Sequence, residues 1–148
     1  MTFEERYYRT LVVSSSQKFN ETISPLLKSA RCESIVFADS IAHAKRKFLE
    51  NHFDFVIINA PLKDETGTKF SIDVSTGKNS VCLLFVNAEH YSDIKNKVTQ
   101  HGVFILSKPT SILAISHSLD FLSSARERLR KLEKKALTIE EKMEEIRL

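Results

Sequence analysis

The sequence is poor in the features that mark disulfide, metal and membrane proteins. Its 148 residues include two cysteines, and Cys32 and Cys82 lie too far apart for a CxxC or metal-ligand spacing. No run approaches the ~20 apolar residues that a membrane-spanning helix requires, and the first ten residues lack the apolar core of a signal peptide. We therefore expect a cytoplasmic protein with two semi-buried thiols and neither a metal nor a cofactor.

Charge of one sign is also scarce. The 22 lysines and arginines nearly balance the 19 acidic residues, which leaves a net charge of +3. Domains that bind nucleic acid usually show a strong basic footprint. Residues 126–148 mix basic and acidic side chains, which favours a solvated helix face over a phosphate-binding patch. At this length one globular domain with an appendage is expected.

Apolar runs alternate with amphipathic stretches along most of the chain. Five apolar runs predict strands, at residues 11–13, 34–37, 55–59, 81–86 and 103–106. Continuous apolar strands are typical of a parallel sheet that is covered on both faces. We therefore predict an α/β fold, an open five-stranded parallel sheet with helices on both sides, over residues 1–121.

Signals for the helices are uneven. Ser40 is a predicted N-cap, and Gly102 is predicted to close a helix over residues 89–100. Pro25 is expected to kink or end the first helix. After the third strand, residues 70–74 suggest only a short, weak helix.

Sites in open parallel sheets lie at the carboxyl ends of the strands. The polar residues predicted there are Ser14, Ser15, Asn59, Asn87 and Lys108. None is a carboxylate, serine hydroxyls are poor Mg²⁺ ligands, and the Asn59 amide is a feeble nucleophile. We therefore expect no catalysis here. Lys108 is expected to hydrogen-bond the Asn59 side-chain oxygen or a backbone carbonyl.

Loop carboxylates offer no clear replacement for the missing acids. Asp64 and Glu65 follow the third strand, but loop acids at that distance from a strand end are usually solvated. We expect both of these carboxylates to lie in water.

Beyond residue 121 the apolar residues recur in alternating steps of three and four. This heptad series comprises Leu122, Ala125, Leu129, Leu132, Ala136, Ile139, Met143 and Ile146. A helix folding back on its own domain is the alternative, but it would need a turn, and no glycine or proline follows Pro109. We therefore predict that residues 122–148 form a parallel coiled coil that makes the chain a homodimer.

Several segments together resemble the degenerate receivers of ANTAR-type transcription antitermination regulators. They are residues 44–46, 54–67, 102–109 and 141–148. The resemblance implies a flavodoxin-like, CheY-like receiver fold. Receivers carry metal-binding acids at the positions of Ser14 and Ser15, an acceptor aspartate at Asn59, and a threonine or serine near Asn87. Of this set only Lys108 is retained, which implies a pseudo-receiver that does not accept a phosphoryl group.

The resemblance also implies a function. Regulators of this kind act as dimers and bind paired hairpins in nascent RNA through a C-terminal three-helix module, which prevents transcription termination. That module is expected to follow residue 148. Two alternatives stay open, namely a receiver with an unusual phosphoacceptor and the receiver of a DNA-binding regulator, and docking of a sensor kinase stays open too.

Overall fold

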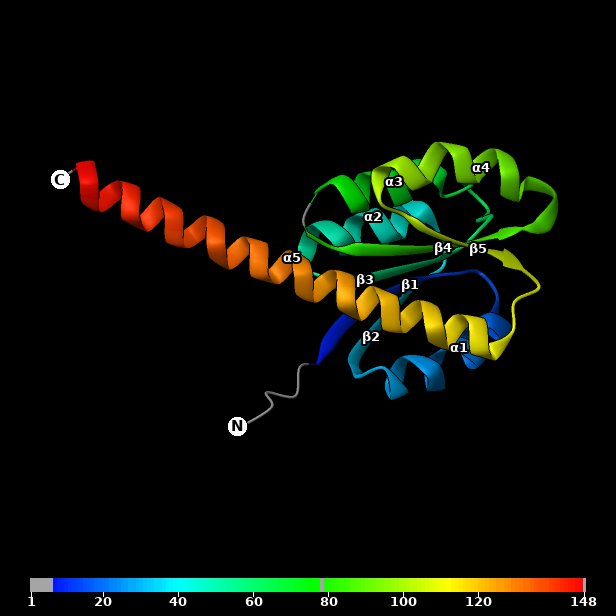
Figure 1. Ribbon diagram of the computed structural model, residues 1–148. Coiled ribbons are helices and arrows are strands. Elements are labelled where there is room, and N and C mark those ends of the chain that lie inside the picture. Colours follow the sequence, from blue (N-terminus) through cyan, green and yellow to red (C-terminus); the bar gives the residue numbers. More distant parts are fainter. Residues whose placement is uncertain (1–6, 78, 148) are drawn as a thin grey trace.

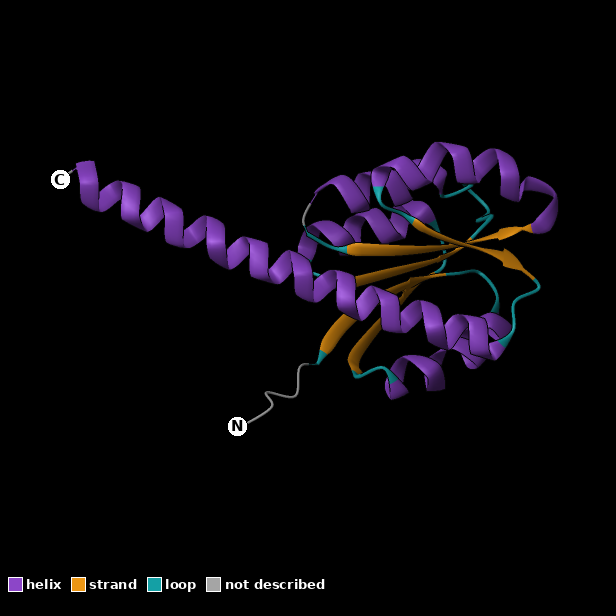
Figure 2. Ribbon diagram, in the orientation of Figure 1, coloured by secondary structure: helices purple, strands orange, loops and turns teal. Residues whose placement is uncertain are grey.

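The computed structural model describes residues 7–77 and 79–147. Residues 1–6 and 148, at the ends of the expected ranges 1–121 and 122–148, lie outside the described residues, as does residue 78. Strands and helices alternate along the chain (Figures 1 and 2). In order, the elements are β1 (Tyr8–Val13), α1 (Gln17–Ser29), β2 (Cys32–Ala38), α2 (Ile41–Glu50), β3 (Phe55–Asn59), α3 (Thr68–Gly77), β4 (Val81–Asn87), α4 (Tyr91–Val98), β5 (Phe104–Lys108) and α5 (Ile112–Arg147).

The strands form one parallel sheet in the order β2-β1-β3-β4-β5. Helices α2, α3 and α4 cover one face, and α1 and the first half of α5 cover the other (Figure 1). The expected five-stranded parallel architecture is therefore confirmed.

Each face of the sheet has its own apolar core, because successive side chains of a strand point to opposite faces. In β3, Ile58 packs under α2 and α3, whereas Ile57 packs under α1 and α5. Each large side chain buried in this way stabilises the fold by roughly 1.5 to 3 kcal/mol. This double burial explains the continuous apolar runs.

The two thiols lie deeper than expected, because both occupy strands of the covered sheet. Cys32 and Cys82 are free and buried. Burial raises the pKa of the Cys82 thiol far above its ordinary value. Neither thiol is therefore reactive in the folded chain.

Some elements differ from the predictions. Helix α3 runs over ten residues, because Phe70 and Val74 are buried and tertiary packing outweighs weak helix propensity. Helix α1 continues through Pro25. Pro25 and Glu21 are both exposed, so water can satisfy the carbonyl that a proline leaves without a donor.

The predicted caps are confirmed. The Ser40 hydroxyl accepts from the backbone N–H of His43 at 3.1 Å, and Gly102 adopts a left-handed φ of 83°. The helix before Gly102 is shorter than predicted, because 3₁₀ turns at Ala88–His90 and Thr99–His101 replace its two ends.

The long C-terminal helix is confirmed as well. Helix α5 has 36 residues, and its second half extends away from the sheet (Figure 1). Within residues 7–77 and 79–147, no helix combines the length and apolar character needed to cross a membrane.

Candidate functional site

The candidate site lies where β1, β3 and β5 end. Strands β1 and β3 are neighbours, and the chain order of the sheet reverses at this point, which is the usual place for a site in such folds. Ser14 directly follows β1, Asn59 is the last residue of β3, and Lys108 is the last residue of β5.

These three side chains form one hydrogen-bonded chain. The Asn59 amide nitrogen donates to the Ser14 hydroxyl at 3.3 Å. The Lys108 ammonium donates to the Asn59 side-chain oxygen at 2.8 Å and to the Ala60 carbonyl at 2.7 Å. The expected hydrogen bond from Lys108 is therefore present, and the ammonium binds both the Asn59 side-chain oxygen and a backbone carbonyl.

The surroundings of the hydrogen-bonded side chains Ser14, Asn59 and Lys108 are basic. Burial lowers the pKa of the Lys108 ammonium from its ordinary value. A cavity of about 360 Å³ opens beside these side chains. Its walls are formed by Ser16, Lys18, Phe19, Thr22, Asn59, Phe85, Lys108, Pro109, Thr110 and Ile115. Two lining residues are lysines and none is acidic. Such a wall repels a divalent cation and offers it no carboxylate.

The other two predicted site residues lie apart from this chain. Ser15 is exposed to solvent. Asn87 ends β4 and faces a different cavity of about 400 Å³, whose walls are Ala60, Pro61, Thr66, Thr68, Val86, Asn87, His90, Asp93, Ile94 and Lys97. The structure thus brings together three of the five predicted residues.

Asp64 has a structural role that the sequence analysis did not predict. Its carboxylate accepts from the backbone N–H groups of Ile41 at 3.0 Å and Ala42 at 2.9 Å. These hydrogen bonds lower the pKa of the Asp64 carboxyl, and the bond from Ile41 has the largest effect. Lys45 of α2 also pairs with Glu65 at 3.4 Å. Both acids are exposed to solvent, as expected, but they also attach the loop after β3 to the first turns of α2.

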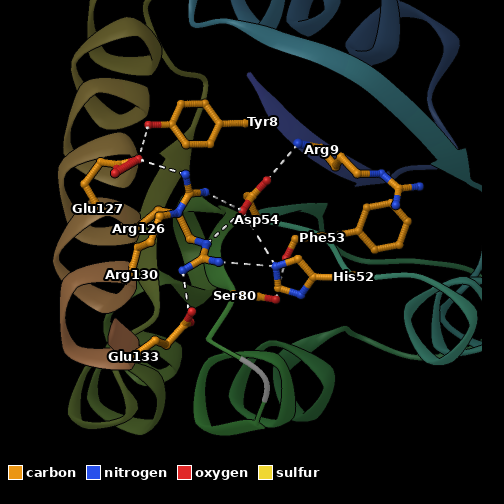
Figure 3. Close-up of polar contacts among 10 residues, drawn as sticks. All are labelled: Tyr8, Arg9, His52, Phe53, Asp54, Ser80, Arg126, Glu127, Arg130 and Glu133. Atoms are coloured by element: carbon orange, nitrogen blue, oxygen red, sulfur yellow. Dashed lines mark hydrogen bonds and ion pairs between the residues drawn. The ribbon is translucent and has the colours of Figure 1, made fainter. Parts of the chain in front are cut away.

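A buried ion pair lies at the opposite end of β3 (Figure 3). Asp54, the residue before β3, accepts from Arg126 of α5, with 2.8 Å between Oδ1 and Nε. Its other oxygen accepts from the backbone N–H of Arg9 at 3.0 Å. Both side chains of the pair are almost completely buried. This pair fastens the middle of α5 to the sheet.

Further charged groups surround the pair. Arg126 also donates to Glu133 at 3.3 Å, and its guanidinium lies 3.3 Å from Nε2 of His52. Arg130 approaches the Asp54 carboxylate at 3.4 Å. We call Asp54, Arg126, Arg130 and Glu133 the helix clamp.

Tyr8 of β1 makes a separate contact with α5. Its hydroxyl donates to the Glu127 carboxylate at 3.1 Å. Burial and then the nearby Glu127 charge raise the pKa of the Tyr8 phenol.

The helix clamp was not predicted from the sequence, although a signal for it was present. Ile115, Leu119 and Leu122 form the buried stripe of α5, and Arg126 continues their spacing of four and three residues. An arginine on the apolar face of a helix requires a buried acidic partner. That spacing could have identified Arg126, but not Asp54.

The residues of the predicted dimer seam differ in burial, and they fall into two groups. Leu122 is buried in the core of its own domain, and Ala125 and Leu129 pack partly against that core. The remaining members of the series are exposed, namely Leu132, Ala136, Ile139, Met143 and Ile146. The first three positions therefore face their own domain, because contacts between α5 and the domain continue past residue 121 as far as Arg130, which pairs with Asp54.

Comparisons with known proteins identify the fold of this chain. No family model matches the sequence, and the search of curated proteins found no match. Solved structures do match. An adenylate cyclase from Rhodopirellula baltica superposes with a TM-score of 0.77 at 16% identity, covering 88% of this chain and 98% of that one.

Receiver domains match as well. The signal receiver domain of an HD domain-containing protein from Pseudomonas fluorescens Pf-5 gives a TM-score of 0.68 at 21% identity, covering 86% of this chain and 98% of that one. A response regulator receiver domain protein from Clostridium thermocellum gives 0.70 at 18% identity, covering 84% and 98%. The chain therefore has the fold of a CheY-like response-regulator receiver domain.

Proposed function

We propose that this chain is a non-catalytic pseudo-receiver and dimerisation module of a response regulator. The observation that carries the proposal is the hydrogen-bonded chain of Ser14, Asn59 and Lys108. In a phosphoacceptor site the atoms of Asn59 would belong to a carboxylate that attacks phosphorus. Here they belong to a neutral amide whose oxygen and nitrogen both have protein partners.

The chemistry of phosphoryl transfer supports this proposal. The reaction requires a nucleophile and a divalent cation that balances the charge on the phosphoryl oxygens. Within residues 7–77 and 79–147, no group of three or more histidine, cysteine or acidic residues is placed to hold a metal ion. Lys108 does supply a cation at the site, but its ammonium already binds two oxygens of the protein.

An atypical phosphoacceptor is the alternative, and its best candidate is the exposed hydroxyl of Ser15. Intact-mass spectrometry after incubation with Mg²⁺ and acetyl phosphate separates the two functions, with a phosphorylatable receiver as the positive control. The proposal predicts no phosphoryl adduct. An adduct would contradict it, and Ser15→Ala would then show whether Ser15 is the acceptor.

Metal binding is tested separately. Titration with Mg²⁺ while amide chemical shifts of residues 13–16 and 59–61 are recorded should give no saturable change, because the cavity wall carries lysines instead of carboxylates. Saturable shifts confined to these residues would show a metal site and overturn the proposed chemistry.

The proposed output is helix α5. Its second half leaves the domain with exposed apolar residues, which supports association with a second copy of this chain. We further propose that the regulator acts in transcription antitermination, with RNA binding supplied by a separate module on the C-terminal side of α5. The support for this step is the resemblance of the sequence to ANTAR-type regulators, and the role would place the protein in the cytoplasm.

Filter binding tests the assignment of RNA binding to another module. Residues 1–148 should bind a paired-hairpin leader RNA weakly and without sequence preference, because positive and negative charges are nearly balanced. Tight, sequence-dependent binding by this chain would contradict that assignment.

A further inference from the structure

Helix α5 has two apolar faces. One face packs on the domain through Ile115, Leu119 and Leu122 and continues to the buried Arg126. The other face is exposed, and we call it the outer stripe: Phe121, Leu132, Ala136, Ile139, Met143 and Ile146. Phe121 and Leu132 keep 64% and 60% of their surface exposed.

The members of the outer stripe lie along one side of the helix. Phe121, Leu132, Ile139 and Met143 follow one another at intervals of 11, 7 and 4 residues. These intervals are close to whole numbers of turns at ~3.6 residues per turn. The exposed Arg128 lies between Phe121 and Leu132 on this side of the helix, so the uninterrupted apolar part begins at Leu132.

The outer stripe differs from the heptad seam that the sequence alone indicates. That seam also includes Leu122 and Leu129, and each lies roughly 60 to 100° around the helix from the line of the outer stripe. Both residues face their own domain. A second copy could reach them only if α5 rotated about its axis or left the sheet.

The helix clamp opposes such a rotation. Arg126 lies on the face that packs on the sheet, and its guanidinium contacts Asp54 at 2.8 Å and Glu133 at 3.3 Å. A rotation that brought Leu129 outward would carry Arg126 away from Asp54 and leave a buried carboxylate without its closest partner. Separating such a pair is unfavourable because both charges are shielded from water.

The charges flanking the stripe favour a second copy in parallel orientation. The g positions of the heptad are all basic: Arg128, Lys135 and Lys142. An antiparallel pair would bring all of these basic positions together. A parallel pair brings Lys135 beside Glu140 of the second copy, and only Lys142 then meets a like charge, that of Arg147. Glu133, the expected partner of Arg128, is already engaged by Arg126 of its own chain.

We propose that the helix clamp sets the rotational position of α5, so that a second copy of this chain docks in parallel on the outer stripe and not on Leu122 and Leu129. This inference rests on the proposed homodimer and specifies its surface. The clamp joins β3 to the dimer contact, since Asp54 immediately precedes that strand. The docking surface is thereby determined by a contact inside each subunit.

Disulfide cross-linking of the full chain tests the inference. Single cysteines replace Leu132, Ile139, Leu129 or Leu137, while the native thiols stay buried and unreactive. Leu137 is the matched control because it is 58% exposed but lies about 140° from Leu132 around the helix. Leu132→Cys and Ile139→Cys should cross-link between copies several-fold faster than Leu129→Cys and Leu137→Cys.

Loss of the clamp should change this pattern. In an Arg126→Met background, the cross-linking rate of Leu129→Cys should rise towards that of Leu132→Cys. If the Cys32 and Cys82 thiols stay unreactive, the Arg126→Met variant is folded. If these thiols react, Asp54→Asn replaces Arg126→Met as the variant that lacks the clamp. An unchanged rate for Leu129→Cys in a folded clamp variant would overturn the role of the clamp.

The cross-linking pattern distinguishes a dimer that uses another docking surface from the absence of a dimer. Equal cross-linking of Leu129→Cys and Leu132→Cys with an intact clamp would overturn the inference and leave the dimer standing. No cross-linking at any position, together with a monomeric mass, would overturn the dimer itself and the inference with it.

Discussion

Asp54 and Arg126 are 72 residues apart in the sequence and form an ion pair inside the folded chain, with 2.8 Å between Oδ1 and Nε. The pair joins the residue before β3 to the middle of α5. At the other end of β3, Asn59 is held by Ser14 and Lys108. One strand therefore connects the degenerate pocket with the helix that is proposed to carry the output.

Removal of the Arg126 side chain should destabilise the domain. Arg126→Ala leaves the buried Asp54 carboxylate without its closest partner, and breaking a buried pair in this way costs about 3 to 5 kcal/mol. Arg128→Ala is the matched control, because Arg128 is exposed on the same helix and surface substitutions usually change stability by less than ~0.5 kcal/mol. Urea unfolding measures both. Equal, small effects would show that the ion pair does not fasten α5.

Lys108→Met should also destabilise the fold. It removes the ammonium that donates both hydrogen bonds and leaves the Asn59 oxygen and the Ala60 carbonyl without their lysine partner, at a cost of about 1 to 3 kcal/mol for each group that stays buried. Thermal or urea unfolding near neutral pH measures the loss. A neutral substitution would mean that water replaces the ammonium at the site.

The pH dependence of Lys108 has a defined sign. Burial lowers its folded pKa below the ordinary value of 10.5, so between the two values the unfolded chain binds more protons than the folded one. The free energy of unfolding of the wild type, relative to Lys108→Met, should therefore rise as the pH increases through this window. Urea titrations across that range test it, and a falling difference would contradict the burial of the ammonium.

Asp64 should confer stability at neutral pH that is lost in acid. Its folded pKa is lowered from 3.8 by the N–H groups of Ile41 and Ala42. The advantage of wild type over Asp64→Asn is thus fully present above that unfolded value and disappears as the pH falls through the lower folded pKa. Unfolding free energies measured from neutral to acid pH test this. Asp73→Asn, at an exposed position of α3, is the control, and the same acid-dependent loss there would argue against a specific contribution of the hydrogen bonds that Asp64 accepts from Ile41 and Ala42.

A comparison of two similarly exposed leucines on α5 tests whether the outer stripe is the surface of association. Leu132 and Leu137 are 60% and 58% exposed, but only Leu132 lies on the outer stripe. Leu132→Asp should weaken self-association, because it places two charges in the seam of a two-fold dimer, and Leu137→Asp should not. Sedimentation velocity measures both. Equal behaviour of the two variants would indicate that another surface drives association.

The fold and the core of the pocket were predictable because they depend on local patterns. Continuous apolar runs predict a doubly covered parallel sheet, and the ends of parallel strands meet at one edge, which brings Asn59 and Lys108 within reach of each other. Helix α3 was underestimated because its stability comes from the burial of Phe70 and Val74, and helix propensity does not report burial.

The helix clamp and the division of the seam were not predictable. A heptad pattern has the same spacing whether its residues pack on their own domain or on another copy, so Leu129 and Leu132 are equivalent in the sequence. They differ only through the rotation of α5 about its axis. That rotation is set by contacts such as Asp54 with Arg126, which no local pattern specifies.

We propose that this receiver-like chain associates constitutively through α5 and does not respond to phosphorylation. Sedimentation equilibrium with and without beryllofluoride and Mg²⁺ tests it most directly. We expect the mass of a dimer, twice 16.9 kDa, under both conditions. A monomer that becomes a dimer only when beryllofluoride and Mg²⁺ are present would contradict it.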